Sequence, residues 1–63
     1  MSVGENIRRI REQRGITQIE LAACVDITRS MMSQIEKGIK NPSLQTGKAI
    51  ADRLECSLEE LLE

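Results

Sequence analysis

Hydrogen-bonding side chains cluster between Thr28 and Gly38, at positions that would share the outer side of a short helix. The segment TRSMMSQIEKG begins with a threonine that can cap a helix and ends with a glycine that can terminate one. Met32 and Ile35 are spaced to face inward. The outward positions would then be Arg29, Ser30, Met31, Ser33, Gln34 and Lys37. The segment therefore predicts a rigid helix with hydrogen-bonding side chains on its outer side, which is the main clue to function.

A second short helix precedes this one and is joined to it by a tight three-residue turn. Thr17 can accept a hydrogen bond from the first turn of that helix, and Glu20 stands three residues later to complete a capping box. Apolar residues at helical spacing predict its inner face: Ile19, Leu21, Ala22 and Val25. Residues 17–38 thus predict two helices that position the polar side chains.

The rest of the chain predicts three more helices around this pair. Ser2 and Glu5 form a capping box for a helix that should run to about Arg14, where Gly15 ends it. The Asn41-Pro42 pair breaks the chain before Ser43, which caps a helix from Leu44 to about Leu54. A last capping box, Ser57 with Glu60, opens a short helix. With no strand pattern, the sequence predicts one all-α domain of five helices over residues 1–63.

Composition limits the kinds of function that the chain can have. Hydrophobic residues make up 40% of the 63 residues but none is aromatic, so the core must be aliphatic and base stacking on single-stranded nucleic acid is excluded. The net charge of −1 divides into +3 over residues 1–48 and −4 over residues 49–63. This asymmetry suggests a dipolar surface whose basic part could attract a polyanion, although an ordinary mixed surface explains it equally well.

Other compositional features argue against a metal site, a cofactor or a membrane. The chain has no histidine, and Cys24 and Cys56 are too few and too far apart for a disulfide framework or a zinc site. No apolar run approaches 18 residues, and no signal peptide is visible. We therefore expect a cytoplasmic protein with two reduced thiols, no cofactor and no small-molecule ligand. An enzyme is disfavoured as well, because a phosphate loop and a cavity-forming length are also missing.

The motif residues, in their order and spacing, resemble a known family. The segment TQIELAACVDITRSMMSQIEKG, then KNPS, then a helix ending in LECSLEELL is similar to the Cro/phage-repressor type of helix-turn-helix, often called the XRE family. The resemblance runs from about Ile7 to Leu62. It implies a lambda-repressor-like DNA-binding domain, a compact bundle of five helices that is usually dimeric on a palindromic operator. It also implies that the helix over residues 29–37 lies in the major groove of double-stranded DNA.

This resemblance assigns roles to the polar residues. Arg29, Ser30 and Gln34 would reach base edges, since arginine suits guanine and glutamine suits adenine. The phosphate backbone would be held around the start of the helix after Thr17 and beyond the end of the recognition helix. The candidate phosphate-binding residues are Thr17, Gln18, Lys37, Lys40 and Asn41. Met31 and Ser33 are weaker candidates, with Met31 placed to touch a thymine methyl group.

Two structural roles follow from the same resemblance. Arg11 and Glu36 match an ion pair that joins the first helix to the end of the third, although two unrelated surface charges are the alternative. Ala22 stands where the two helices of the motif cross at a steep angle, and a small residue is needed there. Leu44, Leu58, Leu61 and Leu62 are candidates for a dimer surface, and the alternative for Leu58 and Leu61 is that they only close the core.

Three positions depart from the family pattern. Asp26 and Glu55 stand in turns where the family usually has glycine in a left-handed conformation, so each should cost about 1 kcal/mol relative to glycine. Gly47 replaces a larger apolar residue inside a helix. Either another helix approaches closely there, or Met31 or Met32 fills a small void.

The sequence as a whole predicts a sequence-specific, DNA-binding transcriptional regulator, most simply a homodimeric repressor. The alternative is an antitoxin-like or accessory module whose main partner is another protein. The acidic C-terminal part gives that alternative slight support.

Overall fold

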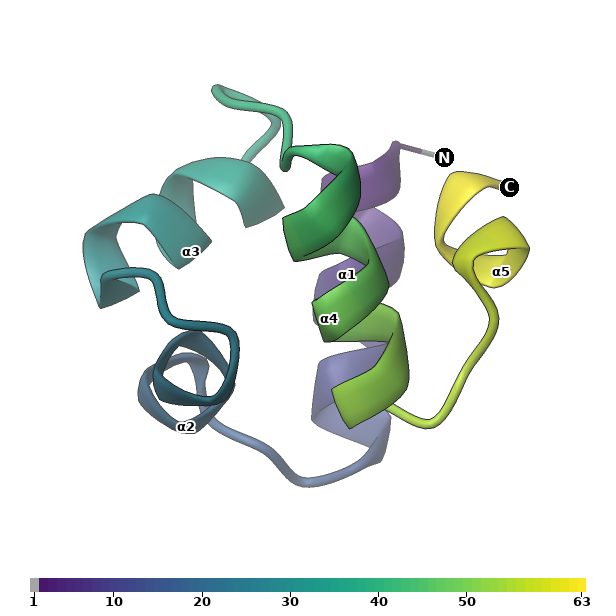
Figure 1. Ribbon diagram of the computed structural model, residues 1–63, viewed down its shortest axis with the longest axis horizontal. Coiled ribbons are helices and arrows are strands. Elements are labelled where there is room, and N and C mark those ends of the chain that lie inside the picture. Colours follow the sequence, from purple (N-terminus) through teal and green to yellow (C-terminus); the bar gives the residue numbers. More distant parts are fainter. Residues whose placement is uncertain (1) are drawn as a thin grey trace.

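Five helices surround an aliphatic core in the computed structural model, which describes residues 2–63 (Figure 1). Their bounds are α1 Val3–Gln13, α2 Gln18–Cys24, α3 Arg29–Glu36, α4 Leu44–Arg53 and α5 Leu58–Leu62. Strands are absent from this described part of the chain, so the predicted all-α fold is confirmed. In Figure 1, α2 and α3 lie on one side of α1 and α4, and α5 lies on the other. Within residues 2–63 no helix is long and apolar enough to cross a membrane.

The helix starts are where the hydroxyl residues predict them. Each helix follows a serine or threonine whose side chain accepts a hydrogen bond from the backbone amide three residues later. In α1, α2 and α5 a glutamate returns the bond to the capping residue, which completes a capping box. These bonds satisfy amides that have no partner inside a helix, and they involve only residues three apart. Local sequence therefore determines where each helix begins.

Four turns place a residue in the left-handed backbone region. Gly15 and Gly38 have φ angles of 70° and 79° where α1 and α3 end, as their residue type predicts. Asp26 and Glu55 have φ angles of 62° and 57°. The expectation that these two turns require positive φ without a glycine is therefore confirmed.

The core is aliphatic, and one residue predicted to lie in it does not. Helix α2 buries Leu21 and Ala22, and Val25 is buried directly after it, but Ile19 is 64% exposed. At 100° per residue, Ile19 stands about 110° from the centre of the face that those three residues form. The prediction that Ile19 faces inward is thus wrong, because a helix of seven residues buries only one narrow stripe.

Polar side chains of α1 hold the other helices, and the sequence did not single out most of them. Asn6 is buried and its Nδ2 donates to the carbonyl oxygens of Leu61 and Glu63, both at 2.9 Å. Arg14 Nε donates to the carbonyl oxygen of Leu54 at 2.9 Å. Helix α1 therefore satisfies carbonyl groups at the ends of α4 and α5 that those helices cannot satisfy themselves.

Two glycines have opposite environments. A Cβ atom on Gly4 would overlap the carbonyl oxygen of Ile35, so α1 and the end of α3 touch backbone to backbone. A Cβ atom on Gly47 would meet only Leu58 Cδ1, at an ordinary contact distance of 3.6 Å. Close approach of a helix is therefore the explanation for Gly4 and not for Gly47. The neighbour at Gly47 is a leucine of α5 and not a methionine of α3.

Candidate nucleic-acid interface

Helices α2 and α3 form a packed pair that carries most of the predicted site residues. Ala22 is buried on α2, and Met32 and Ile35 are buried on α3. The two helices contact each other directly, and α3 also packs against α1. The small side chain of Ala22 and the inward apolar residues of α3 are as predicted. This packing fixes the outer surface of α3 relative to the start of α2.

A buried ion pair joins α1 to the end of α3 and confirms the predicted partnership of Arg11 and Glu36. Arg11 Nε lies 2.7 Å from Glu36 Oε2, and Arg11 Nη2 lies 3.0 Å from Glu36 Oε1. The two residues are only 8% and 6% exposed. The third guanidinium nitrogen, Nη1, donates to the carbonyl oxygen of Ile16 at 2.8 Å. The pair is bidentate and its remaining groups have partners, which is the geometry that a buried charge needs.

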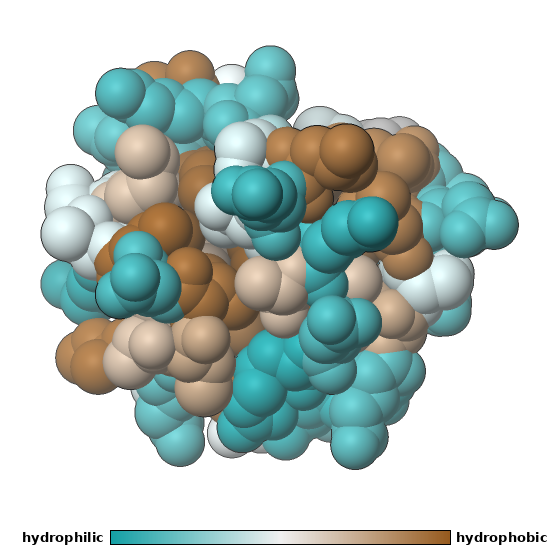
Figure 2. Space-filling model, viewed as in Figure 1, coloured by the Kyte–Doolittle hydropathy of each residue, from teal (hydrophilic) through white to brown (hydrophobic). Residues whose placement is uncertain are grey.

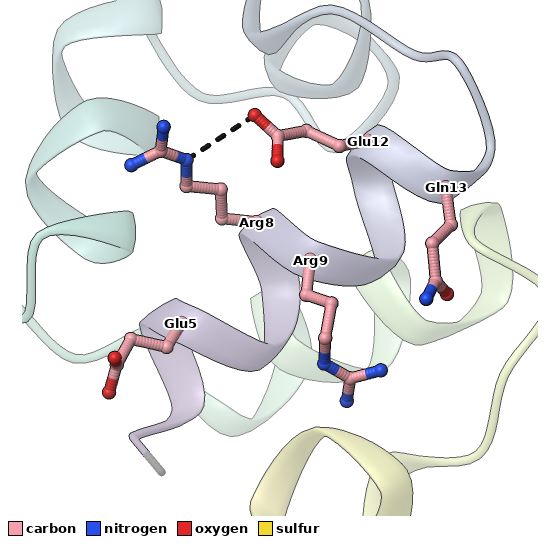
Figure 3. Close-up of a pocket in the computed structure, with 5 residues that line it drawn as sticks. All are labelled: Glu5, Arg8, Arg9, Glu12 and Gln13. Atoms are coloured by element: carbon pink, nitrogen blue, oxygen red, sulfur yellow. Dashed lines mark hydrogen bonds and ion pairs between the residues drawn. The ribbon is translucent and has the colours of Figure 1, made fainter.

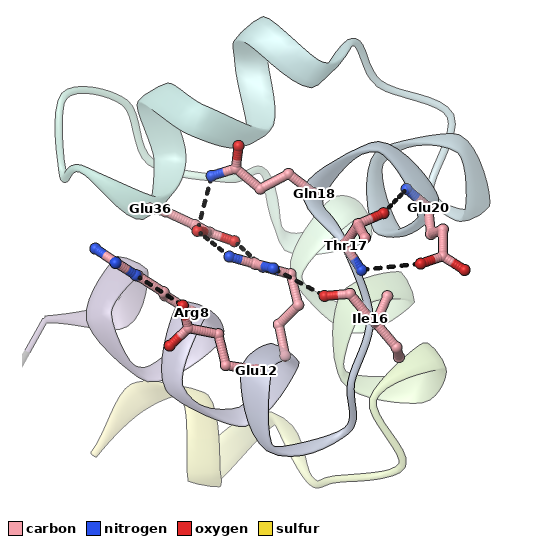
Figure 4. A network of polar contacts seen from close by, with 8 residues as sticks. Arg8, Glu12, Ile16, Thr17, Gln18, Glu20 and Glu36 are labelled. Atoms are coloured by element: carbon pink, nitrogen blue, oxygen red, sulfur yellow. Dashed lines mark hydrogen bonds and ion pairs between the residues drawn. The ribbon is translucent and has the colours of Figure 1, made fainter.

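Gln18 belongs to the same network, a role that sequence reasoning missed. Its Nε2 donates to Glu36 Oε1 at 3.0 Å, across the gap between the start of α2 and the end of α3. Figure 4 shows the Gln18 amide directed at the Glu36 carboxylate, with Ile16 and Thr17 on the connecting segment beside them. One N–H of the amide remains for another acceptor. The network therefore holds Gln18 in one orientation beside α3.

The start of α2 offers fewer donors than the sequence indicates. Thr17 Oγ1 accepts from the Glu20 amide at 3.1 Å, and the Thr17 amide donates to Glu20 Oε1 at 3.0 Å. The hydrogen bond that the Thr17 amide donates to the carboxylate lowers the pKa of Glu20. The amides of Gln18 and Ile19 have no acceptor within the helix itself. A phosphate at this end would meet those two amides, because the capping box occupies the amide of Thr17.

The outer face of α3 matches the prediction closely. Arg29 and Ser30 are exposed in its first turn, and Gln34 is half-buried one turn after Ser30. Met31 is half-buried too and packs against the core, so only part of its side chain lies outward as predicted. Its contact with a thymine methyl group stays a prediction. The three predicted base-reading residues remain on the accessible face.

Two shallow depressions beside Gln18 gather residues from both helices. One, of about 490 Å³, has Thr17, Gln18 and Arg29 in its lining. The other, of about 290 Å³, includes Gln18, Ser33 and Lys37. Predicted phosphate-binding and base-reading residues thus meet around the Gln18 side chain. Arg29 lines the first depression and Lys37 the second, and Glu12 lines both.

The three predicted phosphate-binding residues beyond α3 do not have equivalent surroundings. Lys37 and Lys40 are exposed at and just beyond the end of α3, close to its polar face. Asn41 is also exposed, but it lines an apolar groove together with Leu44 and Leu58. Asn41 therefore stands between the polar surface and a second, apolar one.

That apolar groove lies between the start of α4 and α5, and Figure 2 shows hydrophobic side chains gathered there at the upper right. Leu44 and Leu62 are 68% and 61% exposed, and Leu58 is half-buried. Leu61 is only 1% exposed. Leu61 is therefore a core residue at the bottom of the groove, which agrees with the alternative that it closes the core and not with its candidacy for the dimer surface.

The exposed face of α1 differs from the α2–α3 surface. Figure 3 shows Arg8 turned toward Glu12, 3.4 Å away, while Arg9 and Gln13 extend from another side of the helix. With Glu5 they line an open depression of about 550 Å³ whose charges are mixed and exposed. In residues 2–63 no group of histidine, cysteine or acidic side chains is arranged to hold a metal ion. Both cysteines are free thiols, and burial raises the pKa of Cys56.

Comparison with known proteins gives consistent matches. The immunity repressor protein of Bacillus phage phi105 is 43% identical over 54 residues, which are 86% of this chain and 38% of that protein. The transcriptional regulator DdrOP3 of Deinococcus deserti is 32% identical over 63 residues, all of this chain and 49% of that protein. The chain therefore spans less than half the length of these two relatives.

A solved structure matches across the whole fold. The P22 c2 repressor, crystallised with a synthetic operator, superposes with a TM-score of 0.93 at 30% identity, covering 100% of this chain and 96% of that one. The model of the helix-turn-helix family matches residues 7–61, which include all five helices except the first turn of α1 and the last residue of α5. The chain belongs to the helix-turn-helix family, in its Cro/phage-repressor (XRE) type.

Proposed function

We propose that this chain is a sequence-specific, double-stranded-DNA-binding transcriptional regulator that acts as a repressor and reads the major groove with α3. The observation that carries the proposal is the exposed polar face of α3, held beside the start of α2 by the buried Arg11–Glu36–Gln18 network. The fold is shared with a repressor that was crystallised on its operator, which supports the same function. A rigid polar helix beside a phosphate-binding helix start is the arrangement that major-groove reading requires.

The proposal gives the residues separate roles. Arg29, Ser30 and Gln34 contact base edges, with Arg29 suited to guanine and Gln34 to adenine. Gln18 gives its remaining N–H to a phosphate, together with the first amides of α2. Lys37 and Lys40 neutralise phosphates beyond α3, and Thr17 and Asn41 are auxiliary contacts. The acidic residues of the C-terminal part lie on other elements and do not oppose this surface.

The chain is further proposed to act as a homodimer on a palindromic operator. The apolar groove with Leu44, Leu58 and Leu62 supports this part of the proposal, because exposed leucines beside a groove mark an interaction surface. A two-fold dimer would present two copies of α3 to successive turns of the major groove.

Titration with random duplex DNA at 50 and 200 mM salt tests the proposal. With Lys37 and Lys40 of two protomers as four neutralised phosphates, the logarithmic salt slope should be about −3.6, and the affinity should fall ~10²-fold over this range. Replacing Lys37 and Lys40 by glutamine should flatten the slope equally on every sequence. Binding that is independent of salt would refute phosphate-mediated recognition.

Selection of bound duplexes then separates base reading from phosphate binding. Arg29→Ala should cost about 1–3 kcal/mol on the selected site and relax the preference at one base pair. Arg9→Ala is the matched control, since Arg9 is an exposed arginine of α1 outside the α2–α3 surface. Equal losses for both variants on all sequences would mean that Arg29 does not read a base. Selected sites without two-fold symmetry would contradict the dimer.

A further inference from the structure

The apolar groove between α4 and α5 has a floor without a side chain. Its volume is about 350 Å³, and Gly47 lies buried on the floor between Leu58 and Leu61. The nearest atom to a Cβ on Gly47 would be Leu58 Cδ1 at 3.6 Å, so an alanine would fit without any movement. Glycine inside a helix is unfavourable relative to alanine. Packing within the chain therefore does not require the hollow at position 47.

The edges of the same groove carry two projecting leucines. Leu44 begins α4 and Leu62 ends α5, and both are more than 60% exposed. The same surface thus has a hollow at Gly47 and two exposed leucines that are small enough to enter such a hollow. A two-fold interface applies the same patch to itself, so each copy can supply a projecting leucine and receive one.

The charges beside the groove favour a second copy over other occupants. Lys48 is exposed one turn after Leu44, whereas Glu59 and Glu63 are exposed on either side of Leu62 in sequence. These three residues do not line the groove, but they follow or precede residues that do, so α4 carries an exposed lysine and the α5 segment carries exposed carboxylates. A two-fold-related copy can place each lysine near the carboxylates of its partner. An anionic surface such as DNA or an acidic lipid would be repelled by the glutamates.

We propose that Gly47 forms the floor of a socket that receives an exposed leucine of a second copy of this chain, so that the residue at position 47 sets the strength of the homodimer. The inference rests on the proposed function for the existence of a dimer. It adds the contact that joins the copies, a leucine of one entering the hollow at position 47 of the other, and the residue that decides how tightly they join. Gly47 acts in this way because filling the socket removes space for the partner and leaves the protomer intact.

Sedimentation equilibrium with the 63-residue chain measures the dissociation constant of the dimer for Gly47→Ala and Gly47→Met. The alanine variant should raise that constant about tenfold, since one methyl group overfills a matched interface, and the methionine variant should abolish the dimer. At a concentration low enough for the parent and the variants to be monomeric, both variants should melt at a higher temperature than the parent chain, because they add helix propensity and fill a hollow. Weaker dimers from more stable protomers cannot arise from misfolding.

Leu62→Ala tests the projecting leucine, and Gln45→Ala is the control. Leu62→Ala removes a projecting leucine and should weaken the dimer, whereas Gln45 is exposed on α4 outside the groove and its replacement should change nothing. On duplex DNA, the Gly47 variants should bind a single half-site like the parent and lose cooperativity on a two-half-site palindrome.

Several results would overturn the proposal. It fails if the Gly47 variants dimerise as the parent does, or if the parent is monomeric both in solution and on the palindrome. The first result would refute the role of Gly47 alone. The second would also refute the homodimer of the proposed function, while DNA binding by α3 would still stand. Loss of binding to every duplex by the parent chain would instead refute the proposed function.

Discussion

Replacing Arg11 and Glu36, singly and together, tests whether the buried ion pair holds the α2–α3 surface together. Each single methionine substitution leaves the opposite charge buried without its bidentate partner. Breaking such a pair costs about 3–5 kcal/mol, which is comparable with the whole stability of a 63-residue domain, about 3–9 kcal/mol. Each single variant should therefore melt roughly 12–40 °C below the parent, given about 4–8 °C per kcal/mol.

The double variant should lose less than the sum of the two single losses. With both charges gone, the remaining cost comes from the Ile16 carbonyl group and the Gln18 amide, which lose their charged partners. We expect a coupling free energy of about 2–3 kcal/mol, and it should be nearly independent of salt because the pair is buried. Urea unfolding followed by circular dichroism near 15 °C, where a marginal domain is most stable, measures all four members of the cycle.

The Arg8–Glu12 pair provides the matched control on the same helix. Its Nε–Oε2 distance is 3.4 Å, and both side chains are more than half exposed. The same cycle there should give at most about 0.5 kcal/mol, and that coupling should fall as salt rises. Losses at Arg11 and Glu36 that add within about 0.5 kcal/mol would refute the reasoning, since independent residues behave in that way.

Three further perturbations have a defined expected outcome. Asp26→Gly and Glu55→Gly should each stabilise the fold by about 1 kcal/mol and raise the melting temperature by about 4–8 °C in calorimetry, and an unchanged value would mean that positive φ costs nothing at these turns. Gly4→Ala should destabilise by about 1–3 kcal/mol in urea unfolding, because its Cβ would overlap carbonyl oxygens at the end of α3, and a neutral result would refute that close approach. Hydrogen bonds lower the pKa of the capping glutamates of α1, α2 and α5 in the folded state. The ionised glutamates should therefore stabilise the fold fully above the usual pKa of 4.5, and this contribution should be lost as the pH falls through the lowered values. Melting temperatures between pH 7 and pH 3 should therefore fall less steeply for the triple glutamine variant, and equal slopes would contradict the linkage. The triple variant carries Glu5→Gln, Glu20→Gln and Glu60→Gln.

The sequence by itself determined the elements and their limits. Caps such as Thr17 and Thr28 act on amides three residues away, and Gly15 and Gly38 act on the turn in which they stand. These interactions are local, so residue type and spacing specify them before any helix packs against another. The exposed polar face of α3 could be predicted for the same reason, since helical periodicity separates Met32 and Ile35 from it.

Tertiary structure decided which side chains meet across elements. The Arg11–Glu36 pair could be predicted only through the family resemblance, and the addition of Gln18 to it depends on how the start of α2 stands against the end of α3. Asn6 shows the same limit, because an asparagine on α1 has no local signal for carbonyl groups 55 and 57 residues away.

The same physical reason separates the leucines and the glycines. Leu61 and Leu62 are neighbours of the same type, yet α1 and α4 cover the first and leave the second exposed. Gly4 and Gly47 are both helical glycines, but only Gly4 touches a neighbouring backbone. Residue type and period set what each helix can bury. The distances and angles between helices, which are fixed only when all five pack together, decide what it does bury.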